Sequence, residues 1–162
     1  MRTPPPRKVK AKPVPGQIFD NPVLVSALIS WGIAQGLKIP IEYLRTHHWN
    51  WGVFFSTGGM PSAHTTLMTA TALTIGLFYG FNDPLFGLAV AVAMVVIYDA
   101  TGIRRQAGYH ARRINMLINE LFSGQPISDE RLKEVLGHTP REVVGGITLG
   151  TAVSLIVRLL WH

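Results

Sequence analysis

Long uncharged stretches dominate the pattern of hydrophobic and polar positions along the chain. Four stretches of at least 15 residues contain no Lys, Arg, Asp or Glu. A helix rises about 1.5 Å per residue, so about 20 apolar residues cross a hydrocarbon core of about 30 Å. Small residues (Ala, Gly, Ser, Thr) recur in the stretches, as in closely packed membrane helices. The pattern predicts about four membrane-spanning helices, over Asn21–Leu37, Ala63–Phe81, Pro84–Tyr98 and Val143–Trp161.

Residues 102–121 follow a different pattern. Ile103, Ile114 and Leu121 fall near one helical face, while four arginines and a glutamate occupy much of the rest. This indicates an amphipathic helix that lies at the membrane interface. Beyond it, Ser128 as a cap and Gly137 as a stop predict a short helix. The predicted fold is therefore all-α: a polytopic membrane helix bundle with an interfacial amphipathic helix.

Composition narrows the class of protein. Hydrophobic residues make up 48% and charged residues 15%, against about 25% charged in an average soluble domain, which disfavours a disordered chain. The absence of cysteine excludes a disulfide scaffold, a thiol nucleophile and a cysteine zinc site. The net charge of +6 fits nucleic acid or an anionic membrane, and the uncharged stretches favour the membrane over nucleic acid. Residues 1–16, with five prolines and five basic residues, form a predicted flexible tail, and 17–162 form one membrane-embedded domain.

The order of the predicted crossings gathers polar residues on one membrane face. The first helix ends at this face, the second starts there, the third returns to it, and the fourth leaves from it. No assumption about function enters this count. The residues placed on this face are Lys38, His64, Asp99, Arg104, Arg105, Arg131 and His138.

The first candidate motif precedes the second predicted helix. Gly58 and Gly59 allow close backbone approach, and Ser62 is a good N-cap for a helix that begins at Ala63. The free N–H groups of a helix start attract anions, and His64 would lie beside a bound anion. The alternative is a capped membrane helix with an interfacial histidine.

The second candidate motif precedes the last predicted helix. Thr139 at the N-cap, Pro140 at the first helical position and Glu142 two residues later predict a capping box. The cap alone explains Glu142 but leaves His138 unexplained. A carboxylate one turn further on could also fix the tautomer and orientation of this histidine.

The third candidate motif is Asp99 followed by Arg104 and Arg105. Arginine binds phosphate oxygens through its planar fork. The alternatives are lipid headgroup binding or an ion pair with Asp99 that holds the bundle. For Lys38, the alternative is a lysine that extends from a helix end to the interface.

Together these motifs resemble the divergent branch of the type 2 phosphatidic acid phosphatase family, which is related in its active site to vanadium haloperoxidases. The chain has Lys38 and Arg45 with six residues between them, then Pro-Ser-Ala-His at 61–64 and His138 with Glu142 four residues on. The larger family has Pro after the arginine, Gly before the first histidine and Asp for Glu142. The Ser-Arg pair of its third motif is replaced by Arg131 and Leu132.

The resemblance implies hydrolysis of a lipid phosphate or pyrophosphate through a phosphohistidine, with no metal and no other cofactor. It implies His138 as the nucleophile, Glu142 as its orienting carboxylate and His64 as the general acid. Lys38 and Ser62 would hold phosphoryl oxygens. Arg104 or Arg105 would replace the missing motif arginine, with Arg131 as second choice. Asp99, Gly58 and Gly59 would support the site.

Two functions remain open at this stage. One is a membrane phosphatase acting on lipid phosphates; the other is a non-catalytic membrane subunit or lipid-phosphate-binding protein that keeps the pocket. A haloperoxidase-like vanadate site is disfavoured, because a membrane pocket suits lipids. The expected partners are membrane lipids and a lipid phosphate, with a homo-oligomer or larger membrane complex left open. The expected location is the cell membrane, and the positive-inside rule favours a cytoplasmic site.

Overall fold

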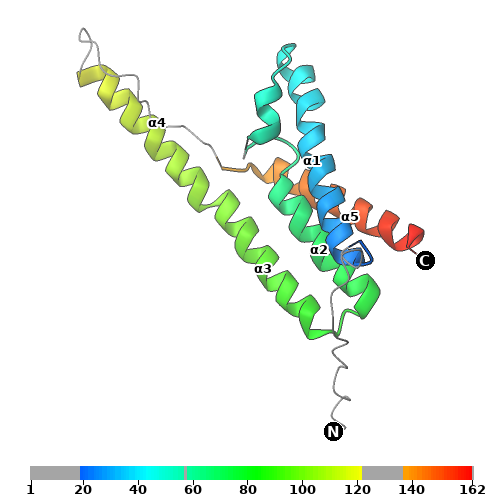
Figure 1. Ribbon diagram of the computed structural model, residues 1–162. Coiled ribbons are helices and arrows are strands. Elements are labelled where there is room, and N and C mark those ends of the chain that lie inside the picture. Colours follow the sequence, from blue (N-terminus) through cyan, green and yellow to red (C-terminus); the bar gives the residue numbers. More distant parts are fainter. Residues whose placement is uncertain (1–18, 57, 122–136, 162) are drawn as a thin grey trace.

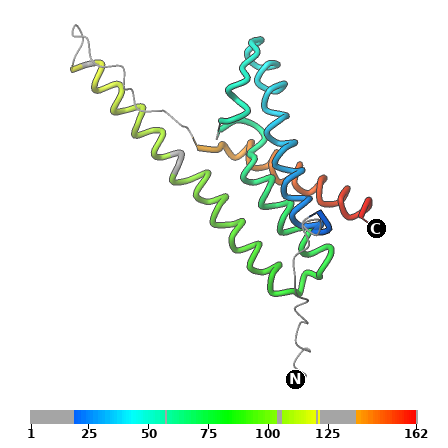
Figure 2. The backbone as a smooth tube through the Cα atoms, in the orientation of Figure 1, coloured from blue at the N-terminus to red at the C-terminus, as the bar shows by residue number. Residues whose placement is uncertain are grey.

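The computed structural model describes residues 19–56, 58–121 and 137–161, except for the side chains of Arg104, Arg105 and Glu120 (Figures 1 and 2). The described residues contain no strand, which confirms the all-α fold. Their helices are α1 (Pro22–Thr46), the 3-10 helix η1 (Trp51–Phe55), α2 (Ala63–Tyr79), α3 (Pro84–Thr101), α4 (Ile103–Leu121) and α5 (Pro140–Leu160).

The long apolar helices begin at polar caps. The Asn21 side chain accepts from the Val23 and Leu24 N–H groups at the start of α1, and Asp83 accepts from Leu85 N–H at the start of α3. Thr139 caps α5, where the predicted capping box is present. A proline follows each of these three caps and is already set in the helical conformation. The caps therefore fix where the chain turns back into the bundle.

Helix α2 lies at the centre and packs on α1, α3 and α5 (Figure 1). The contacts are made by small residues, among them the fully buried Ala34 and Ala70. The Thr74 hydroxyl donates to Ser26 Oγ of α1 at 2.9 Å, and the Ser154 hydroxyl of α5 reaches Ala70 O at 3.2 Å. Small side chains and interhelical hydrogen bonds hold membrane helices together where lipid removes the hydrophobic drive.

Two glycines of α5 allow a close approach to α2. A Cβ on Gly146 would lie 2.8 Å from Ser62 O, and one on Gly150 would lie 2.6 Å from Thr66 O. Both distances are below any normal contact, so only glycine allows α5 to lie this close to the first turns of α2. This approach brings the start of α5 beside the start of α2.

Helices α3 and α4 form an arm that leads away from the bundle (Figure 1). The helical hydrogen bonds run on through their junction, because Gly102 N–H donates to Tyr98 O and Gln106 N–H donates to Gly102 O. Within the described residues, α4 has extended packing only with α3. The sequence predicted an amphipathic helix over residues 102–121, and α4 is a helix over these residues that continues the line of α3.

Within the part of the chain that the structure describes, three helical segments are long and apolar enough to cross a membrane: Pro22–Thr46, Pro84–Asn119 and Pro140–Leu160. The sequence predicted about four. Helix α2 has 17 residues, about 26 Å, and is the shortest of the four helices observed at the predicted spans. Helix α1 extends to Thr46, past the predicted end at Leu37, because Lys38 is buried against the bundle and does not end the helix. The predicted tail and the short helix after Ser128 lie outside the described residues, apart from Gly137.

Candidate functional site

The site lies where α2 and α5 begin. His64 is in the first turn of α2, and His138 directly precedes the N-cap of α5. The ring centroids of the two histidines are 6.0 Å apart. The two helix starts are joined by a hydrogen bond from Ser62 N–H to Glu142 O at 3.0 Å. Two histidines 74 positions apart in the sequence thus share one end of the bundle.

His138 is held by backbone and side chain together. Its side chain is almost fully buried, and Nδ1 lies 2.8 Å from Glu142 Oε2. Its N–H donates to Ala100 O at the end of α3, at 2.9 Å. A carboxylate only accepts, so Nδ1 is the donor in this pair and the lone pair is left on Nε2. The same Glu142 oxygen accepts from Thr139 N–H at 3.3 Å, so one carboxylate closes the helix cap and orients the histidine.

Lys38 brings a positive charge into the same region. Its side chain is 2% exposed, although it lies in a membrane-spanning segment. Its Nζ donates to Ser56 O at 2.8 Å. An ammonium has three donors, so two remain, and within the described residues Lys38 forms no ion pair. A buried charge of this kind in a membrane helix is a mark of a functional site.

Ser62 and the glycines before it shape the start of α2. The Ser62 side chain is fully buried and accepts from Thr65 N–H at 3.3 Å and from the Thr65 hydroxyl at 3.0 Å. Gly59 has φ +92°, which a side chain would strain, and the stem of Lys38 passes close to it. Gly58 precedes it in the same loop.

The predicted arginines are not part of the described site. The side chains of Arg104 and Arg105, and the whole of Arg131, lie outside the described residues. Asp99 lies in the last turn of α3, next to the Ala100 carbonyl that accepts from His138. No cluster of three or more His, Cys, Asp or Glu that could hold a metal is found in the described part of the chain.

Two polar cavities adjoin Lys38. One, of about 190 Å³, is lined by Arg45, Thr139, Arg141 and Glu142 among others. The second, of about 210 Å³, lies between α1 and the start of α2 and includes Gln35 and His64. The sequence reasoning assigned no role to Gln35 or Arg141. A polar amide inside an uncharged stretch was the signal that could have singled out Gln35.

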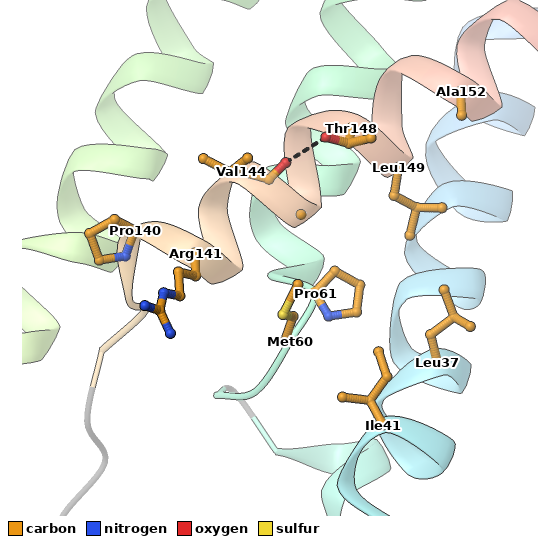
Figure 3. Close-up of a pocket in the computed structure, with 11 residues that line it drawn as sticks. Leu37, Ile41, Met60, Pro61, Pro140, Arg141, Val144, Thr148, Leu149 and Ala152 are labelled. Carbon is orange, nitrogen blue, oxygen red and sulfur yellow. Dashed lines mark hydrogen bonds between the residues drawn. The ribbon is translucent and has the colours of Figure 1, made fainter. Parts of the chain in front are cut away.

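An apolar groove of about 800 Å³ lies beside the first of these cavities, between α1 and α5 (Figure 3). Leu37 and Ile41 form one side, and Leu149 and Ala152 the other. The Thr148 hydroxyl donates to Val144 O at 2.9 Å, so this polar group is satisfied within its own helix. The groove and the 190 Å³ cavity share three lining residues: Ile41, Met60 and Arg141.

The fold and the site together define a helical membrane protein with a paired-histidine site at one end of its bundle. Residues 19–153 match the family model described as "Divergent PAP2 family", and the chain belongs to that family. The chain is also similar to the uncharacterized membrane protein YuiD of Bacillus subtilis (strain 168). The two are 34% identical over 152 residues, which cover 87% of this chain and 96% of the relative. No solved structure matches the chain.

Proposed function

We propose that this protein is an integral membrane phosphatase that hydrolyses a lipid phosphate or pyrophosphate through a phosphohistidine on His138. The observation that supports this most is the 2.8 Å contact between His138 Nδ1 and Glu142 Oε2, with the His64 ring 6.0 Å away. It gives one histidine a directed lone pair and a second histidine a place beside it. Membership of the divergent PAP2 family agrees with this chemistry.

In the first step, the lone pair of His138 Nε2 attacks phosphorus. The N–P bond forms as the bond from phosphorus to the ester oxygen breaks, and His64 gives its proton to that oxygen. Glu142 stabilises the positive charge that develops on the His138 ring. Two neighbouring histidines can divide the nucleophile and acid roles in this way because each is held in a different environment.

The phosphoryl oxygens need positive partners during this step, because phosphoryl transfer is accelerated mainly by positioning and charge stabilisation. Lys38 has two N–H groups to offer, and the Ser62 hydroxyl can also donate to a phosphoryl oxygen. Arg104, Arg105 or Arg131 would supply a further cation. In the second step water attacks phosphorus, the N–P bond breaks, and His64 takes up the proton of the water.

The apolar groove is the reason to propose a lipid as the substrate. It lies between α1 and α5 (Figure 3). It shares Ile41, Met60 and Arg141 with the cavity that Lys38 and Glu142 line. A phosphate at Lys38 could therefore be joined to an acyl or prenyl chain in the groove. Arg141, at the shared boundary, is placed to meet the charge of the head group. The excess of Lys and Arg around this end favours a site at the cytoplasmic face of the cell membrane.

The test is phosphate release by the purified protein in detergent. Phosphatidate, phosphatidylglycerophosphate and a polyprenyl pyrophosphate serve as substrates. We expect release from at least one of them, loss of release in His138→Ala, and full release in the matched control His110→Ala, since His110 is exposed on α4. Equal rates in the wild type and His138→Ala would contradict the proposal.

A second candidate is a lipid-phosphate-binding protein without turnover. The capping box of α5 favours this candidate, because it accounts for the Glu142 carboxylate without any catalytic role. Binding of the lipid phosphates above without any phosphate release would select it.

A further inference from the structure

The cavity between α1 and the start of α2 contains a buried polar group with no partner. Its lining includes Trp31, Gln35, Lys38, Phe55, Ser56 and His64. Gln35 is 9% exposed, and its Oε1 has no hydrogen-bond donor within the described residues. Gln35 lies one helical turn before Lys38, on the same face of α1.

This lack of a partner sets Gln35 apart from the other polar residues buried in the bundle. Thr74 donates to Ser26, and Ser154 donates to Ala70 O and Gly150 O. Buried polar groups are nearly always paired, and an unpaired acceptor costs free energy. Helix α1 is a candidate membrane span, where lipid supplies no hydrogen bond. The carboxamide oxygen is therefore a buried acceptor without a donor, on a residue that lines the cavity.

The neighbouring groups determine what kind of donor fits. A phosphate dianion has only acceptor oxygens, so it suits Lys38 and leaves Gln35 Oε1 unpaired. An ammonium group would be repelled by Lys38, which lines the same cavity. The Ser56 carbonyl already accepts from Lys38, and the Ser56 hydroxyl donates to Val53 O at 2.7 Å. A neutral hydroxyl is the donor that satisfies Gln35 without conflict.

The size of the cavity agrees with a group larger than phosphate alone. At about 210 Å³ it corresponds to about seven water molecules of roughly 30 Å³ each. It also borders His64, the residue proposed to protonate the leaving oxygen. The alcohol part of the substrate would thus lie beside the phosphate, within reach of Gln35.

We propose that Gln35 recognises a free hydroxyl on the alcohol part of the substrate, so that the preferred ligands are lipid phosphates with a glycerol-like head that carries this hydroxyl. This inference rests on the proposed function, because it places the phosphate at Lys38 and the two histidines. Gln35 would distinguish lipid phosphates by a hydroxyl group that the phosphate-binding residues do not contact.

The experiment compares two lipids that differ in one hydroxyl: 1-oleoyl-glycerol-3-phosphate and its 2-deoxy analogue, which have the same chain and the same charge. Binding is measured by titration calorimetry in detergent, on the His138→Ala background so that neither lipid is turned over. We expect the hydroxyl-bearing lipid to bind about tenfold more tightly, the size of one buried hydrogen bond.

Variants of Gln35 identify the source of the preference. Gln35→Met has a similar volume and no acceptor, so we expect both lipids to bind with the affinity of the deoxy lipid. Gln35→Glu keeps an acceptor, so it should keep the preference for the hydroxyl-bearing lipid, even if the added charge weakens the binding of both lipids. Gln106→Met, the same change on exposed α4, should leave both affinities unaltered.

The outcomes separate this inference from the function it rests on. If neither lipid binds, the proposed function fails and the inference fails with it. If both lipids bind equally to the protein with Gln35, the phosphate site stands and the hydroxyl assignment is overturned. A preference that survives in Gln35→Met also overturns it. If Gln35→Met does not fold, the comparison of the two lipids on the protein that retains Gln35 still tests the hydroxyl assignment.

Discussion

The bundle of α1, α2 and α5 and the arm of α3 and α4 use their apolar residues differently. In the bundle, glycines, alanines and hydroxyl residues allow the helices to touch, and polar side chains are paired across helices. In the arm, large side chains such as Val95 and Tyr98 are about 70% exposed or more. A backbone hydrogen bond joins the arm to the site, from His138 N–H to Ala100 O.

This contrast shows which part of the molecule fixes the chemistry. Lys38, His64 and Glu142 all project from bundle helices, and their positions depend on close contacts between those helices. The arm supplies a carbonyl that orients His138 and an apolar surface suited to lipid. Substitutions in the bundle should therefore alter activity, and matched substitutions at exposed arm positions such as His110 and Arg113 should not.

After the loss of release expected for His138→Ala, the largest effect is expected for His64→Ala. General acid help contributes about 10²–10⁴-fold, so cleavage of a lipid ester should slow by this factor. An aryl phosphate, whose leaving group needs no proton, should be affected far less. The measurement is the rate of phosphate release from each substrate. His110→Ala on α4 is the control, and equal losses on both substrates would argue against an acid role.

The next effect is expected for Lys38→Met, which keeps the apolar stem and removes the buried charge. Loss of one donor to the reacting phosphoryl group typically costs about 10²–10³-fold in turnover. Arg113→Met, an exposed cation of α4, should change turnover little. The turnover of both variants is measured from initial rates at saturating substrate. If Lys38→Met kept full turnover, the lysine would have only a structural role.

A smaller effect, on stability, is expected from a pair of glycine substitutions. Gly150→Ala forces a methyl group against Thr66 O and should cost about 1–3 kcal/mol of unfolding free energy. Gly87→Ala on α3 meets nothing within 4 Å, and should stabilise its helix by about 0.5–1 kcal/mol. Thermal unfolding in detergent compares them. A lower melting temperature for Gly87→Ala than for Gly150→Ala would contradict the claim that helices pack more closely in the bundle than in the arm.

Much of the bundle could be predicted because its signals are local. The caps at Ser62 and Thr139 are short motifs, and counting crossings between them placed His64 and His138 on one face. The structure has their rings 6.0 Å apart. The all-α fold followed from the uncharged stretches alone.

The features that escaped prediction depend on packing between helices. The burial of Lys38, which lets α1 continue to Thr46, arises only when α1 meets η1 and α2. Likewise, no sequence motif predicts the unpaired Oε1 of Gln35 or the groove beside Met60. The continuity of α3 and α4 was missed because Gly102 and the following arginines resemble the end of a helix.

The central claim is that His138 carries the phosphoryl group, and trapping that intermediate tests it most directly. Wild-type protein is mixed with a ³²P-labelled lipid phosphate, quenched in alkali within the first turnover, and examined for acid-labile label on histidine. We predict label on His138 in the wild type and in His110→Ala, and none in His138→Ala. Phosphate release from the lipid without any label on His138 would contradict the account.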